Sequence, residues 1–135
     1  MKIKLDEGAK MPTRAHAWDA GLDLYSREDK YVYPGEHAIF DTGVHAAIPK
    51  DCVGLITSKS GLMAKGITSR GTIDSGYTGS IKTVLFNHGS ESYLVRKGDK
   101  ITQLLILPVI ICDTELVDEL EDTERGEGGF GSSGR

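Results

Sequence analysis

Several common features are missing from this 135-residue chain. It has two cysteines, and no apolar run is long enough to cross a membrane as a helix. Cys52 and Cys112 each lie in an apolar stretch, which predicts two small buried side chains and no disulfide framework. The first residues, MKIKLDEG, lack the apolar segment of a secretory signal. We therefore expect a soluble, cytoplasmic protein with no membrane partner.

Runs of positive charge are also missing. Lysine and arginine number 16 against 20 aspartates and glutamates, which gives a formal net charge of −4 and argues against a nucleic-acid partner. The four histidines are scattered without the spacing of metal ligands. What remains is the composition of a single globular domain, with 39% hydrophobic and 27% charged residues.

No window long enough for a typical helix has a clean 3.6-residue period, although residues 61–65 can form one or two turns. Short runs rich in β-branched and apolar residues occur instead, each bounded by Gly, Pro, Asn or Asp. The candidate strands are residues 1–5, 31–33, 37–48, 52–56, 79–86, 93–95 and 101–111. Their spacing predicts an all-β protein, a jelly roll or a related distorted β-barrel.

The last 23 residues do not continue this pattern. Seven of the twelve residues 113–124 are acidic, which indicates a solvated connector. Residues 125–135 read RGEGGFGSSGR, and glycine at that density lets backbone N–H groups converge on an anion such as phosphate. Arg125, Ser132 and Ser133 add donors, and Phe130 has no local partner, so it can stack on a ring from outside. A frayed Gly/Ser tail is the alternative interpretation.

Four polar, glycine-containing segments lie between the strands. In AGLDLYS (20–26), Asp23 can hold a hydrated cation or simply form a turn. In SKSGLMAKG (58–66), hydroxyls and Lys59 at a short helix can bind an anion, or a serine can cap that helix.

The other two segments have the same ambiguity. In GTIDSGYTG (71–79), a hairpin tip can recognise a planar base through its main chain while Asp74 deprotonates a water and Tyr77 shapes the pocket. An ordinary hairpin turn is the alternative. In KGDKITQLLILPV (97–109), Gln103 can point at a site or bond to backbone within its strand.

Together, the four segments and the C-terminal RGEGGFGSSG resemble, in order, the five motifs of the trimeric dUTP diphosphatase (dUTPase) family. The resemblance implies a homotrimer of jelly-roll subunits that hydrolyses dUTP to dUMP and pyrophosphate with Mg²⁺. Such activity supplies dUMP for dTMP synthesis and keeps uracil out of DNA. It also implies a barrel domain with its connector, residues 1–124, and a flexible phosphate-closing arm, residues 125–135, that crosses to a neighbouring subunit.

The resemblance implies a role for each matching residue. Asp74 would activate the water that attacks the α-phosphorus, and Asp23 would hold magnesium through water. The remaining substrate contacts would be as follows: Lys59, Ser60 and Gly61 to the phosphates; Thr72, Ile73 and Lys82 to uracil through the backbone; Tyr77 against a ribose 2′-OH; Gln103 to water or phosphate; Arg125 to the γ-phosphate; Phe130 on uracil; and Gly131, Ser132 and Ser133 over the γ-phosphate.

Three features depart from the family pattern. Lys59 stands where the family usually has arginine, which replaces a bidentate fork by a point charge. Gly76 stands where an acidic residue often precedes the tyrosine, and the segment 65–71 is short. Two other functions fit parts of the sequence. A dCTP deaminase shares the subunit fold but would release ammonia, and a non-catalytic nucleotide-binding or regulatory protein would bind dUTP without turnover.

Overall fold

The computed structural model describes residues 1–130, which form ten strands and one short helix. The strands are β1 (Ile3–Leu5), β2 (Leu22–Tyr25), β3 (Lys30–Val32), β4 (His37–Asp41), β5 (Val44–Ala46), β6 (Cys52–Thr57), β7 (Ile67–Asp74), β8 (Lys82–Asn87), β9 (Tyr93–Val95) and β10 (Lys100–Pro108). The helix, α1, covers Ser60–Met63 and overlaps residues 61–65, where the sequence allows one or two turns. No helix among the described residues has the length and apolar character needed to span a membrane.

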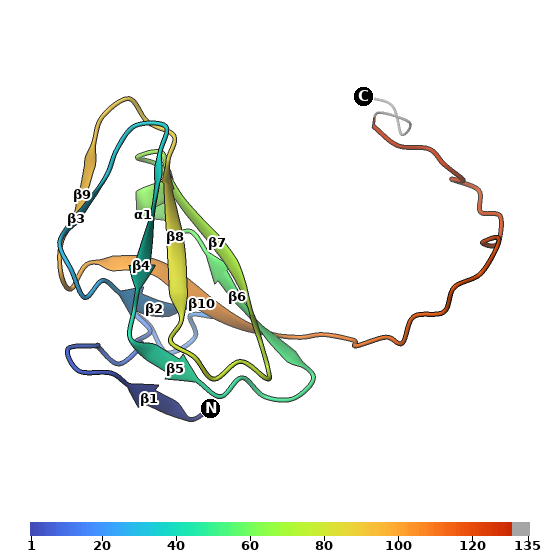
Figure 1. Ribbon diagram of the computed structural model, residues 1–135, viewed down its shortest axis with the longest axis horizontal. Helices are drawn as coiled ribbons and strands as arrows, with labels where there is room; N and C mark the ends of the chain where they lie inside the picture. Colours follow the sequence, from blue (N-terminus) through green and yellow to red (C-terminus); the bar gives the residue numbers. More distant parts are fainter. Residues whose placement is uncertain (131–135) are drawn as a thin grey trace.

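One six-stranded sheet, in the order β2-β10-β6-β7-β8-β4, forms most of the body. It curls into a half-barrel, with the β1–β5 pair below it and the β3–β9 pair at its left in Figure 1. Every pairing is antiparallel. The prediction of an all-β, distorted barrel is therefore confirmed.

The inward-facing side chains form two buried clusters, because residues along each strand alternate between the faces of the sheet. One cluster contains Leu24, Val44, Ala46, Ile48, Ile56, Ile73, Ile81 and Leu104. The other contains Val32, Phe40, Ile67, Leu85, Val95 and Ile101. Together they fix the positions of β2, β6, β7, β8 and β10, whose polar residues form the candidate site.

Several boundaries differ from the predicted strands: β8 begins at Lys82 and not at residue 79, β10 ends at Pro108 and not at residue 111, and β2 was not predicted. The predicted strand 37–48 is two strands, because Gly43 adopts a left-handed φ of 66° between them. β7 was not predicted as a strand over its full length. Its polar residues lack the apolar pattern of a strand, but Ser69 is buried and its hydroxyl bonds to that of Thr102 at 2.7 Å.

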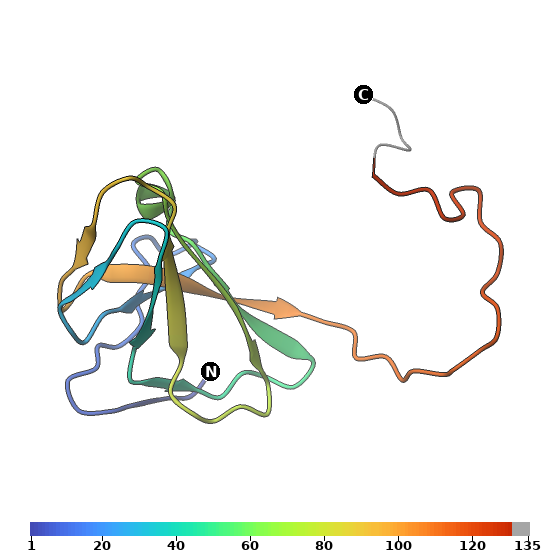
Figure 2. The same cartoon turned by 45° about the horizontal axis from the view of Figure 1, so that its top comes forward.

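Beyond β10 the chain leaves the body (Figures 1 and 2). The last backbone bond to the body joins the Val109 N–H to the Asp51 carbonyl at 2.9 Å. Residues 113–124 are exposed throughout, as the acidic composition predicts. Cys112 directly precedes this segment and is exposed, and Cys52 is half-buried, so the prediction of two buried cysteines was wrong. Both cysteines are free.

Candidate active site

A row of polar side chains crosses four neighbouring strands. Gln103 on β10 pairs in register with Asp23 on β2 and with Thr57 on β6, which in turn pairs with Arg70 on β7. Residues paired in this way share one face of the sheet. The next row contains Leu104 and Ile56, which are buried, so the polar row faces away from the core.

Asp23 is the carboxylate of this row, and only 7% of its side chain is exposed. Its Oδ2 lies 2.7 Å from Lys100 Nζ, and its Oδ1 accepts a short hydrogen bond from Lys59 Nζ. A β-bulge between Lys100 and Thr102 interrupts the β10–β2 register, and bulges commonly re-aim side chains in this way. Burial alone would raise the pKa of Asp23, but the hydrogen bonds and charges of Lys100 and Lys59 outweigh it and lower this pKa.

Asp23, Lys59 and Gln103 border a cleft of about 310 Å³. Its other lining residues are Ala15, Asp19, Ala20, Gly21 and Leu105. The ammonium groups of Lys59 and Lys100 face the carboxylates of Asp23 and Asp19, so the charges around this cleft balance. Lysine ammonium groups beside an amide donor can bind a phosphorylated ligand.

Gln103 lies at the edge of this cleft, between Ser58 and Gly21. Its Nε2 donates to the Ser58 carbonyl at 3.1 Å, which is a strand-to-loop bond and leaves the second N–H of the amide free to donate. A side chain at Gly21 would overlap Gln103 Oε1 and lie 3.1 Å from its Cδ. Gly21 is therefore a site residue that sequence reasoning did not single out. The signal was its place beside Asp23 in the first motif.

The loop before α1 presents backbone and lysine to the same cleft. Lys59 is the N-cap of α1 and has extended backbone angles, but no side chain caps the helix. The Ser58 hydroxyl bonds instead to the backbone of Ser69. The alternative of an ordinary serine cap is therefore wrong. Ser60 and Gly61 are exposed, and nothing lies within 4 Å of a Cβ built on Gly61.

The β7–β8 hairpin opens before its turn. Cross-strand pairing between the two strands ends at Arg70 and Val84, although β7 continues to Asp74 and β8 begins at Lys82. Continuing the register would place Thr72 opposite Lys82, and their facing main-chain groups have no partner across the hairpin. The Ile73 side chain points into the core, so only its backbone can reach a ligand here.

Asp74 and Tyr77 stand at the end of this opening. Asp74 is exposed at the last position of β7, and its carbonyl accepts from the Tyr77 N–H at 3.0 Å. The Tyr77 hydroxyl donates to the Ser80 carbonyl at 2.9 Å. A Cβ at Gly79 would lie 2.5 Å from Tyr77 Cζ, so the ring rests directly on this glycine. Gly79 thus sets the ring position, a role that the sequence does not reveal.

Asp74 and the Asp23 cluster are far apart within one chain. β7 is three strands from β2 in the sheet, and Asp74 lies four residues along β7 from Arg70, the residue in the polar row. Strand geometry makes that offset roughly 13 Å along the strand alone. One chain therefore holds two separate sets of predicted site residues.

The C-terminal arm carries a third set. Arg125 Nε donates to the Gly128 carbonyl at 2.9 Å, and Phe130 is fully exposed. The C-terminal segment that carries them, drawn in red, lies away from the body of its own chain (Figure 2). Gly131, Ser132 and Ser133 lie outside the described residues. Within residues 1–130, no group of three or more histidines, cysteines or carboxylates could hold a metal ion.

Residues 7–134 match the family model described as dUTPase, so the match includes both the body and the glycine-rich end. The deoxyuridine 5′-triphosphate nucleotidohydrolase of Clostridium tetani is 46% identical over 140 residues, which covers 100% of this chain and 97% of that protein. Solved structures of phage proteins are similar in fold as well as in sequence.

A mutant dUTPase of Staphylococcus bacteriophage 80alpha with dUpNHpp has a TM-score of 0.91 and 34% identity, and the match covers 99% of this chain and 98% of that chain. A mutant dUTPase from phage phi11 of S. aureus, described as revealing the coordination of a structural Mg(II) ion, has a TM-score of 0.81 and 31% identity over 90% of this chain and 98% of that chain. Family model, sequence and fold therefore agree over nearly the whole length, and this chain belongs to the dUTPase family.

Proposed function

We propose that this chain hydrolyses dUTP to dUMP and pyrophosphate. The observation that carries the proposal is the opened end of the β7–β8 hairpin, where unpaired main chain around Thr72 and Lys82 leads directly to Asp74. Parallel rows of N–H and C=O groups can bond to the edge of a uracil ring. The Tyr77 ring, which rests on Gly79, closes the pocket against a ribose 2′-OH.

Asp74 acts as the general base in this proposal. Its exposed carboxylate takes a proton from a water, and the water oxygen forms a bond to the α-phosphorus. The bond between that phosphorus and the bridging oxygen to the β-phosphorus breaks, and pyrophosphate leaves with the electron pair. The products are dUMP and pyrophosphate, and the proton remains on Asp74 until solvent removes it.

The Asp23 cleft holds the phosphates. Lys59 and Lys100 supply two ammonium groups, and the exposed backbone of Ser60 and Gly61 lets phosphate oxygens approach. The free N–H of Gln103 can position a water or a phosphate. Lys59 already contacts Asp23, so it offers the phosphates a shared point charge and not a bidentate fork.

The residues of this cleft fit a hydrated Mg²⁺. Both oxygens of Asp23 accept from lysines, which suits contact through metal-bound water better than direct ligation. Asp19 adds a second carboxylate to the same cleft, and Mg²⁺ usually keeps several waters beside one or two carboxylates and substrate phosphates. When bound, Mg²⁺ would neutralise charge on the phosphate oxygens.

We further propose that the complete site is shared in a homotrimer. The separation of Asp74 from the Asp23 cluster supports it, because both sets must reach one triphosphate. Residues 1–124 then form the barrel domain with its connector, and residues 125–135 form the closing arm on a neighbouring subunit. On this arm Arg125 would reach the γ-phosphate, Phe130 would stack on uracil, and Gly131, Ser132 and Ser133 would cover the γ-phosphate.

Pyrophosphate release tests the activity. We expect release from dUTP, little from dTTP, dCTP or UTP, and a loss of rate when Mg²⁺ is removed. Ammonia from dCTP would indicate a deaminase instead. Tight dUTP binding without pyrophosphate would indicate a non-catalytic binding protein, and either result would refute the proposal.

Subunit mixing tests the shared site. Asp74→Asn subunits and subunits truncated before Arg125 are each expected to be inactive alone. If arm and base come from different subunits, mixed oligomers contain complete sites, so unfolding the two variants together and refolding them restores activity. The matched control refolds each variant separately before mixing. Activity that never recovers in proven mixed oligomers would show that the arm serves its own subunit.

A further inference from the structure

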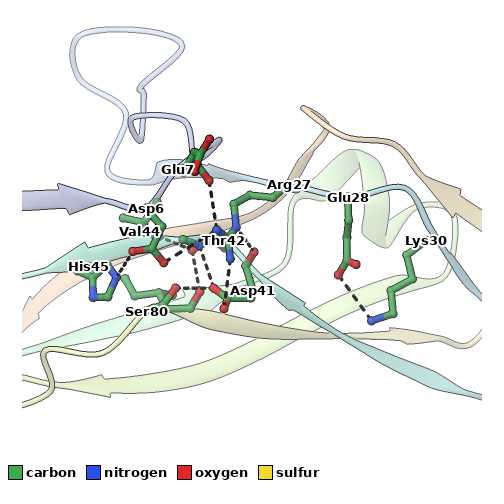
Figure 3. A network of polar contacts seen from close by, with 12 residues as sticks. Asp6, Glu7, Arg27, Glu28, Lys30, Asp41, Thr42, Val44, His45 and Ser80 are labelled. Carbon is green, nitrogen blue, oxygen red and sulfur yellow. Dashed lines mark hydrogen bonds and ion pairs between the residues drawn. The ribbon is translucent and has the colours of Figure 1, made fainter.

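The turn between β7 and β8 is tied to the N-terminal part of the chain by a polar network (Figure 3). Thr78, within this turn, presents its carbonyl to His45 Nδ1 on β5 at 2.8 Å. The other ring nitrogen of His45, Nε2, lies 3.0 Å from Oδ1 of Asp6, which directly follows β1. His45 therefore bridges the turn that carries Tyr77 and the edge of the small β1–β5 sheet.

Both partners of His45 can only accept hydrogen bonds. A backbone carbonyl has no proton to donate, and an ionised carboxylate has none either. A neutral imidazole has one N–H and can satisfy one of the two, whereas an imidazolium has two and satisfies both. The observed geometry is therefore that of protonated His45.

Several charged side chains lie near His45. Lys4 on β1 and Lys2, which precedes β1, line a second cleft together with His45 and Thr78. Asp6 Oδ2 lies 3.9 Å from Arg27 Nη1, and the Nη2 of the same guanidinium lies 3.3 Å from Asp41 Oδ2. The Thr78 hydrogen bond raises the pKa of His45, the Asp6 hydrogen bond and charge add to this, and they outweigh the opposing effects of burial and of Lys4.

A second anchor of the same turn does not depend on His45. The Ser80 hydroxyl donates to Asp41 Oδ1 in a short bond, and the Ile81 N–H bonds to the Val44 carbonyl at 2.8 Å. Loss of the His45 proton therefore breaks one of the two bonds that link Thr78 to Asp6, while the Ser80 end of the turn stays attached. Thr78 lies between Tyr77 and Gly79, whose contact sets the ring position.

We propose that His45, as an imidazolium donating from both ring nitrogens, is a positioning residue that holds the Tyr77 turn in place for dUTP. This role rests on the proposed function for its kinetic consequence. The anchor is intact when His45 is protonated, and one of its two bonds is lost as pH rises through the raised pKa of His45. The KM for dUTP then increases by about threefold to tenfold, the size expected for one hydrogen bond, while kcat changes less.

Two variants make the test sharp. His45→Gln keeps a neutral side-chain donor, so it removes the pH-dependent step in KM. Asp6→Asn keeps an acceptor and removes its charge, so the step moves to lower pH. His37→Gln is the matched control, because His37 is an exposed histidine on β4 whose ring contacts Phe86 outside this network. Its KM profile stays that of the wild type.

NMR on the wild-type protein decides the structural part without any activity. We expect both ring nitrogens of His45 to carry protons at pH 6, a titration midpoint above the usual 6.5, and movement of the Thr78 and Gly79 amide signals with the same midpoint. A neutral His45 at pH 6, unmoved amide signals, or an unchanged KM profile in His45→Gln would each overturn the inference. Absence of pyrophosphate release in the wild type would instead refute the proposed function.

Discussion

Replacing Gly79 with alanine is expected to move the Tyr77 ring without unfolding the protein. The new Cβ would lie 2.5 Å from Tyr77 Cζ and 2.9 Å from Cε2, whereas ordinary contact begins at 3.4 Å. The ring must therefore retreat by roughly 1 Å, and displacements of that size can reduce catalysis by about 100-fold. The ring belongs to a half-exposed side chain, so it can yield where a buried neighbour could not.

The effect on stability is expected to be small. Displacing the ring breaks the bond from the Tyr77 hydroxyl to the Ser80 carbonyl, which contributes about 1 kcal/mol. The backbone of Gly79 does not have a positive φ, so alanine is tolerated there and stabilises by ~0.4–1 kcal/mol through the unfolded state. The two effects nearly cancel, which separates a loss of activity from a loss of fold.

The assay compares three variants by initial rates of pyrophosphate release from dUTP and UTP, with thermal unfolding measured in parallel. Gly79→Ala is expected to lose about 10- to 100-fold in kcat/KM for dUTP and part of its discrimination against UTP. Gly76→Ala is the matched control in the same turn, because nothing lies within 4 Å of its Cβ. Tyr77→Phe keeps the ring and loses only the Ser80 bond, so its effect lies between. Equal activities of the two alanine variants would refute the reasoning.

Three further outcomes follow from the site. Asp74→Asn is expected to keep dUTP binding by calorimetry and lose about 10²- to 10⁴-fold in kcat, and near-normal turnover would remove Asp74 from the role of base. Truncation before Arg125 is expected to leave the melting temperature unchanged while pyrophosphate release falls at least about tenfold, since residues 113–124 are exposed. A lower melting temperature would show that the arm is structural. The lowered pKa of Asp23 stabilises the fold fully above the unfolded value of 3.8, and this stabilisation is lost as pH falls through the lowered value. The gap in free energy of unfolding between wild type and Asp23→Asn therefore narrows in acid denaturation below pH 3.8, and a constant gap would contradict the pairing.

Periodicity predicted the strands whose burial is simple and failed where polar residues are buried. β9 and most of β10 follow from runs of apolar residues bounded by turn signals. β7 did not, because Thr68, Ser69 and Arg70 look like loop residues until their partners are known. Ser69 is buried and bonds to Ser58, in the loop after β6, and to Thr102 on β10, and no local pattern encodes these contacts.

The motifs identified the site residues, but only the structure shows the contacts that require a given residue type at each position. Sequence placed Gly21 and Gly79 inside motifs, and contacts with Gln103 and Tyr77 explain why a side chain does not fit there. The pairing of Asp23 with Lys59 and Lys100 was also beyond prediction, because it joins three segments that are distant in sequence. The apolar run before Cys112 is typical of a buried strand, but β10 ends at Pro108 and Cys112 lies on the exposed segment that follows.

Among the described residues, the candidate site consists of parts that are each ordered but lie far from one another. The hairpin is fixed by Gly79, His45 and Asp41, and the phosphate cleft is fixed by Gly21 and the lysine pair on Asp23. In the proposed homotrimer, each part is already ordered within its own subunit, so association would not need to reshape the fold, and the entropic cost of completing the site would be low. The arm is the exception, because its hydrogen bonds among residues 110–130 are local turns around Thr123–Gly128. In the proposed shared site, bound substrate and the neighbouring subunit supply the contacts that order the arm, which links closure of the site to the presence of dUTP.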